Sequence, residues 1–313
     1  MTDELRLEEL GVAVLVYGQS NGHVELIEDL RAAGLEDEHL IVVHNPDRPT
    51  DGWRPVSPDG ATVIALERNV GYAAGMNRAI DAFAARGLNA VLLLTHDVRV
   101  QRTTLRALVA AANAAPGYGV LGLAVRGAGG VETSYGSFLR GDGIVEHVTR
   151  RPDGEGVADS MFVDGSAMFV RVNACGPSPL PERYFMYFEE AELCSNVRRR
   201  GWGVGTALDA AATSVSGIRH RRAAFQYLYV RNGLDWAWRH QGRGAALRYL
   251  AHELRRAAVD VPKPGGRRFR DSQQRRAGYE ALLARLLGVG DFLRRRWGPP
   301  PELLLRASDV RNV

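Results

Sequence analysis

The chain has 313 residues, of which 45% are hydrophobic and 24% are charged, as is ordinary for a folded soluble protein. Its length is enough for one large α/β domain with an appendage, or for two small domains. No apolar run approaches the roughly 20 residues of a membrane-spanning helix, and the acidic start MTDELRLEEL has no apolar signal core. We therefore expect a cytoplasmic protein.

The net charge of +4 hides an asymmetry between the two ends of the chain. Residues 217–313 carry 21 Arg and Lys against 8 Asp and Glu, a net charge of +13, whereas residues 1–216 have a net charge of −9. A basic tail of this kind is typical of solvated helix faces, or of contact with an anionic acceptor or the inner face of a membrane. No basic motif interleaved with aromatic residues points to nucleic acid. Two cysteines, Cys175 and Cys194, are too few for a zinc site and are expected to be reduced thiols.

Short apolar runs alternate with amphipathic stretches through the first two thirds of the chain. We expect strands at 12–17, 39–44, 62–66, 90–94 and 119–125, with those at 39–44 and 62–66 buried, and helices at 24–33, 71–85 and 103–115. This alternation predicts an α/β fold with a mostly parallel sheet and helices on both faces. Ligands bind such sheets beyond the carboxyl ends of the strands. The residues after Tyr17, His44, Leu66 and Leu94 are therefore expected to converge on one site.

The second half of the chain has less regular patterns. A hairpin is expected around Gly141-Asp142-Gly143, two strand halves at 160–171, an aromatic strand at 184–188 leading into a helix that Gly201 ends, and helices at 223–240, 245–258 and 272–287 with a break at 262–266. We therefore expect an α/β domain over residues 1–216 and an Arg-rich helical extension over residues 217–313.

The segment ERNVGYAAGMN, residues 67–77, is the most informative stretch. Asn69 and Gly71 directly follow a predicted strand, and Gly71, Gly75 and Asn77 open a predicted helix. Glycines there let a ligand approach the backbone, and the amino end of a helix favours negative charge. The spacing matches neither the dinucleotide fingerprint nor a P-loop. Taken alone, the pattern is more typical of a simple tight turn than of a ligand site.

This segment resembles the N-x-G-x-(A/G)-x-G-x-N signature of the family 2 inverting glycosyltransferases. Three further blocks resemble the family in the same order: LLLTHDV at 92–98, VDGSAMFVR at 163–171 and YFMYFEEAELCSNVRRRGW at 184–202. Arg231-Asn232 also has a counterpart in the bacterial rhamnosyltransferase-like members. The resemblance covers about residues 12–235. It implies a GT-A-type, Rossmann-like domain that binds a nucleotide sugar.

The resemblance places Asp97 at the end of the family's D-x-D-like motif, where it would bind a divalent cation, Mg²⁺ or Mn²⁺, together with the donor diphosphate. Such a cation neutralises the charge that builds up on the leaving group. The first carboxylate of the motif is absent, because this chain has Thr95-His96-Asp97. His96 is a second ligand, a phosphate contact or a polar rim residue. His220 lies where several members have a metal-ligating His, although a histidine beside three arginines is more often a surface residue.

A carboxylate must take the proton of the acceptor hydroxyl. The resemblance places Glu190 at the position of the family's catalytic Asp, with Glu189 and Glu192 as neighbours that tune it. Acids in the first turn of a helix are also favourable without any catalytic role. Asp164 either lines the acceptor side or only forms a bend between strands.

Two further residues are predicted at the nucleotide. Asn45 matches the Asn of the family's D-N-x-S turn, with His44 in place of the usual Asp, and Tyr17 follows the first strand, where it would contact the base. These residues complete the expected donor site.

The sequence thus predicts an inverting transfer of a hexose or deoxyhexose from a UDP- or dTDP-sugar to a hydroxyl acceptor. The acceptor would be a saccharide, a lipid-linked intermediate or a secondary metabolite, and a homodimer is a further option. The alternatives are a sugar-phosphate nucleotidyltransferase, whose Gly-rich loop the segment GQSNG at 18–22 matches poorly, and a catalytically inactive relative that binds sugar nucleotides. The absent first Asp and the Glu in place of Asp keep the last alternative open.

Overall fold

Two units make up the chain in the computed structural model, which describes residues 4–18, 22–47, 60–127, 133–139, 145–215, 222–260 and 272–309. The sheet unit comprises Met1–Phe138, Val145–Glu182 and Glu189–Ile218, and the helical unit comprises Leu139–Ile144, Arg183–Phe188 and Arg219–Val313. The short segment Arg183–Phe188, which belongs to the helical unit, therefore interrupts the sheet unit in sequence. The predicted hairpin turn at Gly141-Asp142-Gly143, the break at 262–266 and His220 lie outside the described residues.

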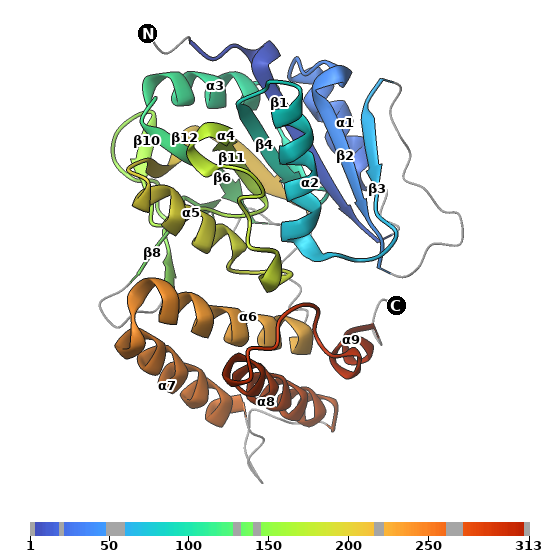
Figure 1. Ribbon diagram of the computed structural model, residues 1–313, viewed down its shortest axis with the longest axis vertical. Helices are drawn as coiled ribbons and strands as arrows, with labels where there is room; N and C mark the ends of the chain where they lie inside the picture. The colour runs from blue at the N-terminus through green and yellow to red at the C-terminus, as the bar shows by residue number, and fades with distance from the viewer. Residues whose placement is uncertain are drawn as a thin grey trace. The chain divides into compact units, whose positions relative to one another are not determined.

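A ten-stranded mixed sheet forms the centre of the sheet unit (Figure 1). Its strands are β1 (Leu10–Tyr17), β2 (Leu40–Asn45), β3 (Thr62–Ala65), β4 (Ala90–Thr95), β5 (Val98–Val100), β6 (Tyr118–Arg126), β7 (Thr133–Ser134), β10 (Val157–Asp159), β11 (Ala167–Arg171) and β12 (Gly203–Ser214). The order is β10-β12-β6-β11-β4-β1-β2-β3, with β5 paired to β12 and β7 paired to β6. β1 runs parallel to β2 and β4, β2 to β3, and β6 to β12, whereas β11 is antiparallel to β4 and β6. A separate pair joins β8 (Ser137–Leu139) to β9 (Val145–His147).

Helices cover both faces of this sheet because the buried side chains of β1 alternate between them. Leu10, Val12, Val14 and Val16 belong to one apolar cluster with residues of α1 (Gly22–Ala32) and α3 (Thr104–Ala114). On the opposite face, a Cβ placed on Gly11 would meet the ring of Phe83 in α2 (Gly71–Ala85). The other described helices of the unit are α4 (Val172–Cys175) and α5 (Glu189–Arg199), with 3₁₀ turns η1 (Leu7–Glu9) and η2 (Asp37–His39). A further 3₁₀ turn, η3 (Glu182–Tyr184), spans the point where the chain passes into the helical unit.

The structure confirms the predicted α/β class, the mostly parallel sheet and the bounds of α2. It corrects three details. β3 is half-buried to exposed, because it lies at the edge of the sheet order. Only the second half of 160–171 is a strand, while the first half makes a single bridge between Ser137 and Phe162. The twelve-residue strand β12 was not predicted, because its sequence GVGTALDAAATS is rich in Gly and Ala and low in strand-forming residues.

The predicted aromatic strand at 184–188 is also wrong. The 3₁₀ turn η3 ends at Tyr184, and three non-glycine residues that follow have left-handed backbones, with φ of 66° at Phe185, 70° at Tyr187 and 71° at Phe188. A strand requires extended backbone angles, so this segment turns sharply instead.

The helical unit contains α6 (Arg222–Trp236), a π-helical turn η4 (Ala237–Gln241), α7 (Arg243–Asp260), α8 (Ser272–Leu293) and α9 (Glu302–Asp309). Helix α6 packs against α7, α8 and α9. A Cβ on Gly288 of α8 would lie 2.7 Å from the carbonyl oxygen of Tyr227, so these two helices approach each other closely at a glycine. A buried ion pair joins Arg285 of α8 to Glu253 of α7.

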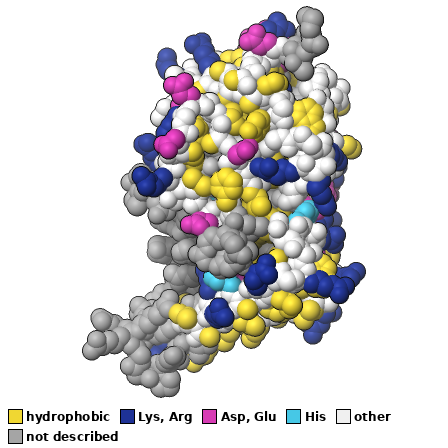
Figure 2. Space-filling model, turned by 90° about the vertical axis from the view of Figure 1, so that its left-hand side faces the viewer, with side chains coloured by type: hydrophobic (Ala, Val, Ile, Leu, Met, Phe, Trp, Pro, Cys, Tyr) yellow, Lys and Arg dark blue, Asp and Glu magenta, His cyan; other side chains and the backbone are white. Residues whose placement is uncertain are grey.

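Figure 2 shows hydrophobic side chains exposed on one face of the molecule, with charged side chains scattered among and around them. In the helical unit, Leu247, Leu254 and Val259 of α7 and Leu283 and Leu286 of α8 are exposed large hydrophobic residues. Among the described residues, no helix combines the length and the hydropathy that crossing a membrane would require.

The packing of α4 and α5 on β6 generates a first prediction. A Cβ on Gly119 would lie 2.6 Å from Cβ of Ala174 and 2.9 Å from Cγ1 of Val197, so the Gly119→Ala substitution overpacks the core. We expect a loss of about 1–3 kcal/mol in the free energy of unfolding, measured by urea denaturation. Gly117→Ala, two residues away with nothing within 4 Å of its Cβ, is the control and should not destabilise. Equal midpoints for both variants would contradict this packing.

Candidate active site

The carboxyl ends of β1, β2 and β4 meet at one edge of the sheet because the three strands are parallel neighbours. Hydrogen bonds link the residues at and just after these strand ends. The amide of Gly18 donates to the carbonyl of Asn45 (3.1 Å), and the amide of His96 donates to the carbonyl of Leu15 (3.0 Å). His44 is buried, and its Nε2 lies 3.2 Å from the carbonyl oxygen of Gly18. Since a carbonyl only accepts, Nε2 carries the proton, and His44 holds the turn after β1.

Asn45 builds the turn that precedes α2. It is 1% exposed, and its Oδ1 accepts from the amide of Val70 at 3.0 Å. Its Nδ2 donates to Oδ1 of Asn69 and to the carbonyl of Gly71, both at 3.1 Å. Oδ1 of Asn69 accepts in turn from the amide of Gly71 at 2.9 Å, and Gly71 has a φ of 84° that favours glycine. The predicted Asn and Gly residues therefore shape the amino end of α2, where the N–H groups of the first turn lack helical partners.

Gly75 and Asn77 have packing contacts inside the sheet unit. A Cβ on Gly75 would lie 2.8 Å from Cδ1 of Leu15, so glycine lets α2 approach β1. Asn77 is 1% exposed and exchanges hydrogen bonds with the backbone of Leu180, at 2.9 Å as donor and 3.0 Å as acceptor. These contacts account for both residues without a bound ligand.

Asp97 follows β4 at the same edge of the sheet. It is half-buried, its Oδ1 accepts from Oγ1 of Thr95 at 2.5 Å, and its carbonyl accepts from the amide of Val215 at 2.8 Å. His96 is half-buried beside it, and its Nδ1 lies 3.4 Å from the amide nitrogen of Tyr17. The structure therefore brings the predicted residues Tyr17, His96 and Asp97 into one stretch of the edge.

The turn Asp164–Ser166 lies next to Asp97. Oδ1 of Asp164 accepts from the amide (2.9 Å) and the hydroxyl (2.6 Å) of Ser166, and the carbonyl of Ser166 accepts from the amide of Thr95 (3.0 Å). Because β11 is antiparallel to β4, the residues before β11 lie beside those after β4. Gly165, in the middle of this turn, faces Glu190: a Cβ there would lie 3.7 Å from Cβ of Glu190.

Tyr72 of α2 lies close to these acids. Its hydroxyl donates to the carbonyl oxygen of Gly165. Burial raises the pKa of Tyr72 well above its usual value, and the nearby Glu189, Glu190 and Asp164 raise it further. Tyr72 stands directly after Gly71 in the predicted motif, at the first turn of the helix. The sequence reasoning did not single it out, and an aromatic hydroxyl at the ligand-facing end of a helix was the available signal.

The acids of α5 differ in their surroundings. Glu189 is 4% exposed, and its Oε2 has no hydrogen-bond partner among the described residues. Burial raises the pKa of Glu189 well above its usual value, and the charge of Glu190 raises it further. Glu190 is half-buried, whereas Glu192 is 8% exposed. Of the three acids, Glu190 is therefore the one that combines solvent access with contact to the Asp164–Ser166 turn.

Asp97 fits a weakly chelated divalent cation. Mg²⁺ is commonly held by one or two carboxylates together with substrate phosphates and waters, so a single protein carboxylate suffices. Within the described ranges, Glu36, Glu38 and His39 are the one set of three side chains with ligand atoms within 4.8 Å of one another. They lie just before β2, at the opposite edge of the sheet, and exposed acids of this kind are common without a metal.

Comparison with known proteins gives matches at the level of structure. No protein-family model matches the sequence, and no curated protein matches it. GalNAc-T7 with UDP, GalNAc and Mn²⁺ is similar with a TM-score of 0.54 and 11% identity, over 93% of this chain and 59% of that one. TarS from S. aureus is similar with a TM-score of 0.50 and 15% identity, over 96% of this chain and 53% of that one. The chain thus spans a little over half the length of these two proteins. It has the GT-A glycosyltransferase fold.

The buried acid Glu189 generates a prediction of pH-dependent stability. Its pKa in the folded state lies above the ordinary value of 4.5, so its favourable contribution is complete below about pH 4.5 and is lost as the pH rises toward the folded-state pKa. Glutamine cannot ionise and avoids this loss. As the pH rises through this window, the free energy of unfolding of Glu189→Gln should increase relative to that of the wild type, by up to about 1.4 kcal/mol per pH unit.

Urea denaturation at several pH values measures this difference. Glu155→Gln, which removes an exposed carboxylate, should follow the wild type at every pH. If the curves of Glu189→Gln and the wild type stay parallel, Glu189 is ionised in the folded protein.

Proposed function

We propose that the protein is a glycosyltransferase that moves a sugar from a nucleoside diphosphate donor to a hydroxyl acceptor. One observation carries the proposal: on a GT-A fold, three acidic segments meet at the carboxyl edge of the sheet. Asp97 follows β4, the Asp164–Ser166 turn bonds to Thr95 beside it, and Gly165 in that turn lies against Glu190. The first acid suits the leaving diphosphate, and the last suits the attacking hydroxyl.

The donor diphosphate would bind at the amino end of α2. The Asn45 and Asn69 side chains shape this turn, and the partial positive charge of a helix amino end attracts phosphate. The donor hydrogens and Oδ1 of Asn45 already have partners within the turn, so Asn45 positions the site and leaves contact with the base to neighbours such as Tyr17. We propose a UDP- or dTDP-linked hexose or deoxyhexose as the donor.

Asp97 would hold a divalent cation, Mg²⁺ or Mn²⁺. When bound, such a cation neutralises charge on the departing nucleoside diphosphate. Thr95 donates its hydroxyl hydrogen to Oδ1 of Asp97 and so fixes the orientation of the carboxylate.

Glu190 would act as the general base. Its carboxylate takes the proton of the acceptor hydroxyl while the oxygen forms a bond to the anomeric carbon. The bond from that carbon to the phosphate oxygen breaks, and the nucleoside diphosphate leaves with the electron pair. This single displacement inverts the anomeric configuration. Glu189 is unsuited to be the base, because burial favours its protonated form, and a neutral carboxyl next to Glu190 avoids a second negative charge.

The role of Asp97 is tested with Asp97→Asn, which keeps the size of the side chain and removes its charge. We expect transfer that depends on Mn²⁺ or Mg²⁺ to be lost, because the neutral amide is a poor ligand for a hard cation. Calorimetric titration with UDP should also show that added Mn²⁺ no longer raises the affinity. Asp209→Asn, at an exposed position of β12, is the control and should behave as the wild type. Full activity of Asp97→Asn, or of the wild type in EDTA, removes the metal from this mechanism.

The role of Glu190 is tested with Glu190→Gln. General-base assistance contributes typically 10²- to 10⁴-fold, so kcat should fall by about that factor while UDP-sugar binding is kept. Glu189→Gln should lose less, because glutamine resembles the protonated acid. NMR of the product should show an anomeric configuration opposite to that of the donor. A retained configuration, or a loss seen with Glu189→Gln alone, would overturn this assignment, and donor binding without transfer by the wild type would indicate a sugar-nucleotide-binding protein.

A further inference from the structure

The aromatic segment Arg183–Phe188 adopts a backbone that its own residues disfavour. Phe185, Tyr187 and Phe188 have positive φ angles, a region that bulky L-residues rarely enter. Such a conformation persists only where surrounding contacts impose it. The segment belongs to the helical unit, so those contacts are sought there.

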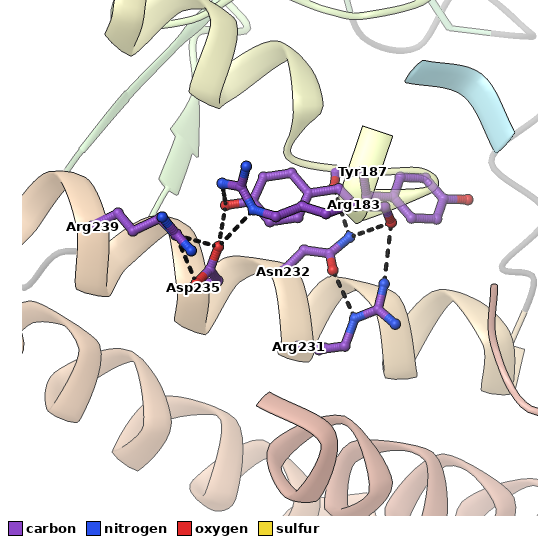
Figure 3. A network of polar contacts seen from close by, with 7 residues as sticks. Arg183, Tyr187, Arg231, Asn232, Asp235 and Arg239 are labelled. Carbon is purple, nitrogen blue, oxygen red and sulfur yellow. Dashed lines mark hydrogen bonds and ion pairs between the residues drawn. The ribbon is translucent and has the colours of Figure 1, made fainter. Parts of the chain in front are cut away.

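The side chain of Asn232 in α6 supplies them (Figure 3). Its Nδ2 lies 3.0 Å from the carbonyl oxygen of Tyr184, 2.9 Å from that of Met186 and 2.9 Å from that of Tyr187. The left-handed turns direct these three carbonyl oxygens toward the same point, which the side-chain amide of Asn232 occupies. Asn232 is 0% exposed, so water cannot replace these bonds.

Arg231 fixes the orientation of Asn232. Its Nε donates to Oδ1 of Asn232 at 2.9 Å, and its Nη2 donates to the carbonyl of Tyr184 at 3.2 Å. Because Oδ1 accepts from a guanidinium, the amide nitrogen must face the segment. Arg231 is itself 0% exposed and donates to the hydroxyl of Tyr227, which donates to Asp291 of α8.

Asp235, one turn further along α6, anchors the start of the segment. Its Oδ2 accepts from Nε of Arg183 (3.2 Å) and from the hydroxyl of Tyr184 (2.9 Å), and Arg239 pairs with it from the next turn (Figure 3). The segment is therefore bound to α6 at its first two residues and at three of its carbonyls.

The segment ends at Phe188, and the next residue, Glu189, begins α5. Phe188 is therefore bonded directly to the first residue of that helix, and Glu190 is its second residue. We propose that Asn232 is a positioning residue for Glu190: it holds the aromatic segment in the left-handed conformation from which the first turn of α5 starts. This inference rests on the proposed function of Glu190.

The test is a double-mutant cycle between Asn232→Ala and Glu190→Gln. Small displacements of a catalytic group cost about 10²-fold in rate, so Asn232→Ala should lower kcat by about that factor and leave the donor KM unchanged. If Asn232 acts through Glu190, Asn232→Ala should have little further effect once Glu190 is glutamine, because residues that act as one unit are not additive. A general structural role would instead lower the rate by the same factor in both backgrounds.

Glu253→Gln is the control for loss of stability, because it weakens the buried ion pair with Arg285 and touches none of the segment. It should leave kcat unchanged at temperatures below its own unfolding. Asn232→Ser, which keeps one hydroxyl donor, replaces Asn232→Ala in the cycle if the alanine variant does not fold. Additive effects, or a kcat of the wild-type value in either Asn232 variant, would overturn the positioning role. A wild-type rate of Glu190→Gln itself would reject the proposed base, a different outcome.

Discussion

The antiparallel strand β11, inserted between β4 and β6, is the constraint on which the site depends. In a parallel sheet, the carboxyl end of a strand is followed by a crossover connection that leads away from it. Reversal of β11 brings an incoming loop, rather than an outgoing one, to the carboxyl end of β4. The ladder bond from the amide of Thr95 to the carbonyl of Ser166 then fixes the Asp164–Ser166 turn beside Asp97. Both acids at this point are thus placed by backbone hydrogen bonds, the most reliable contacts in a sheet.

The first four residues of α5 include three acids, Glu189, Glu190 and Glu192, and the helix places these similar side chains in different surroundings. Successive residues of a helix project about 100° apart, so Glu189 and Glu190 face different surroundings. The packing of Ala191, Cys194 and Val197 determines which acid faces the interior. Burial then raises the pKa of Glu189 and favours its neutral form, whereas Glu190 is only half-buried.

Much of the fold, and less of the site, could be predicted from the sequence. The apolar runs of β1, β2 and β4 and the periodicity of α2 are local signals, and the structure has these elements where they were expected. β12 was missed because Gly and Ala carry little strand signal, and its ladder with β6 is a long-range contact. Likewise, the aromatic run at 184–188 has every local mark of a strand. Contacts with α6, about fifty residues later, override that preference, at a backbone cost of order 1–3 kcal/mol for each strained residue.

The partners of this segment also bear on how the chain folds during synthesis. Tyr184 and Asn232 are 48 residues apart, so the aromatic segment leaves the ribosome well before the amide that pairs with its carbonyls. At about 5–20 residues per second, the delay is on the order of several seconds. During that interval the side-chain amide of Asn232 is not yet present to donate to the three carbonyl oxygens of the segment. The left-handed conformation of the aromatic segment therefore gains these contacts only after α6 has been made.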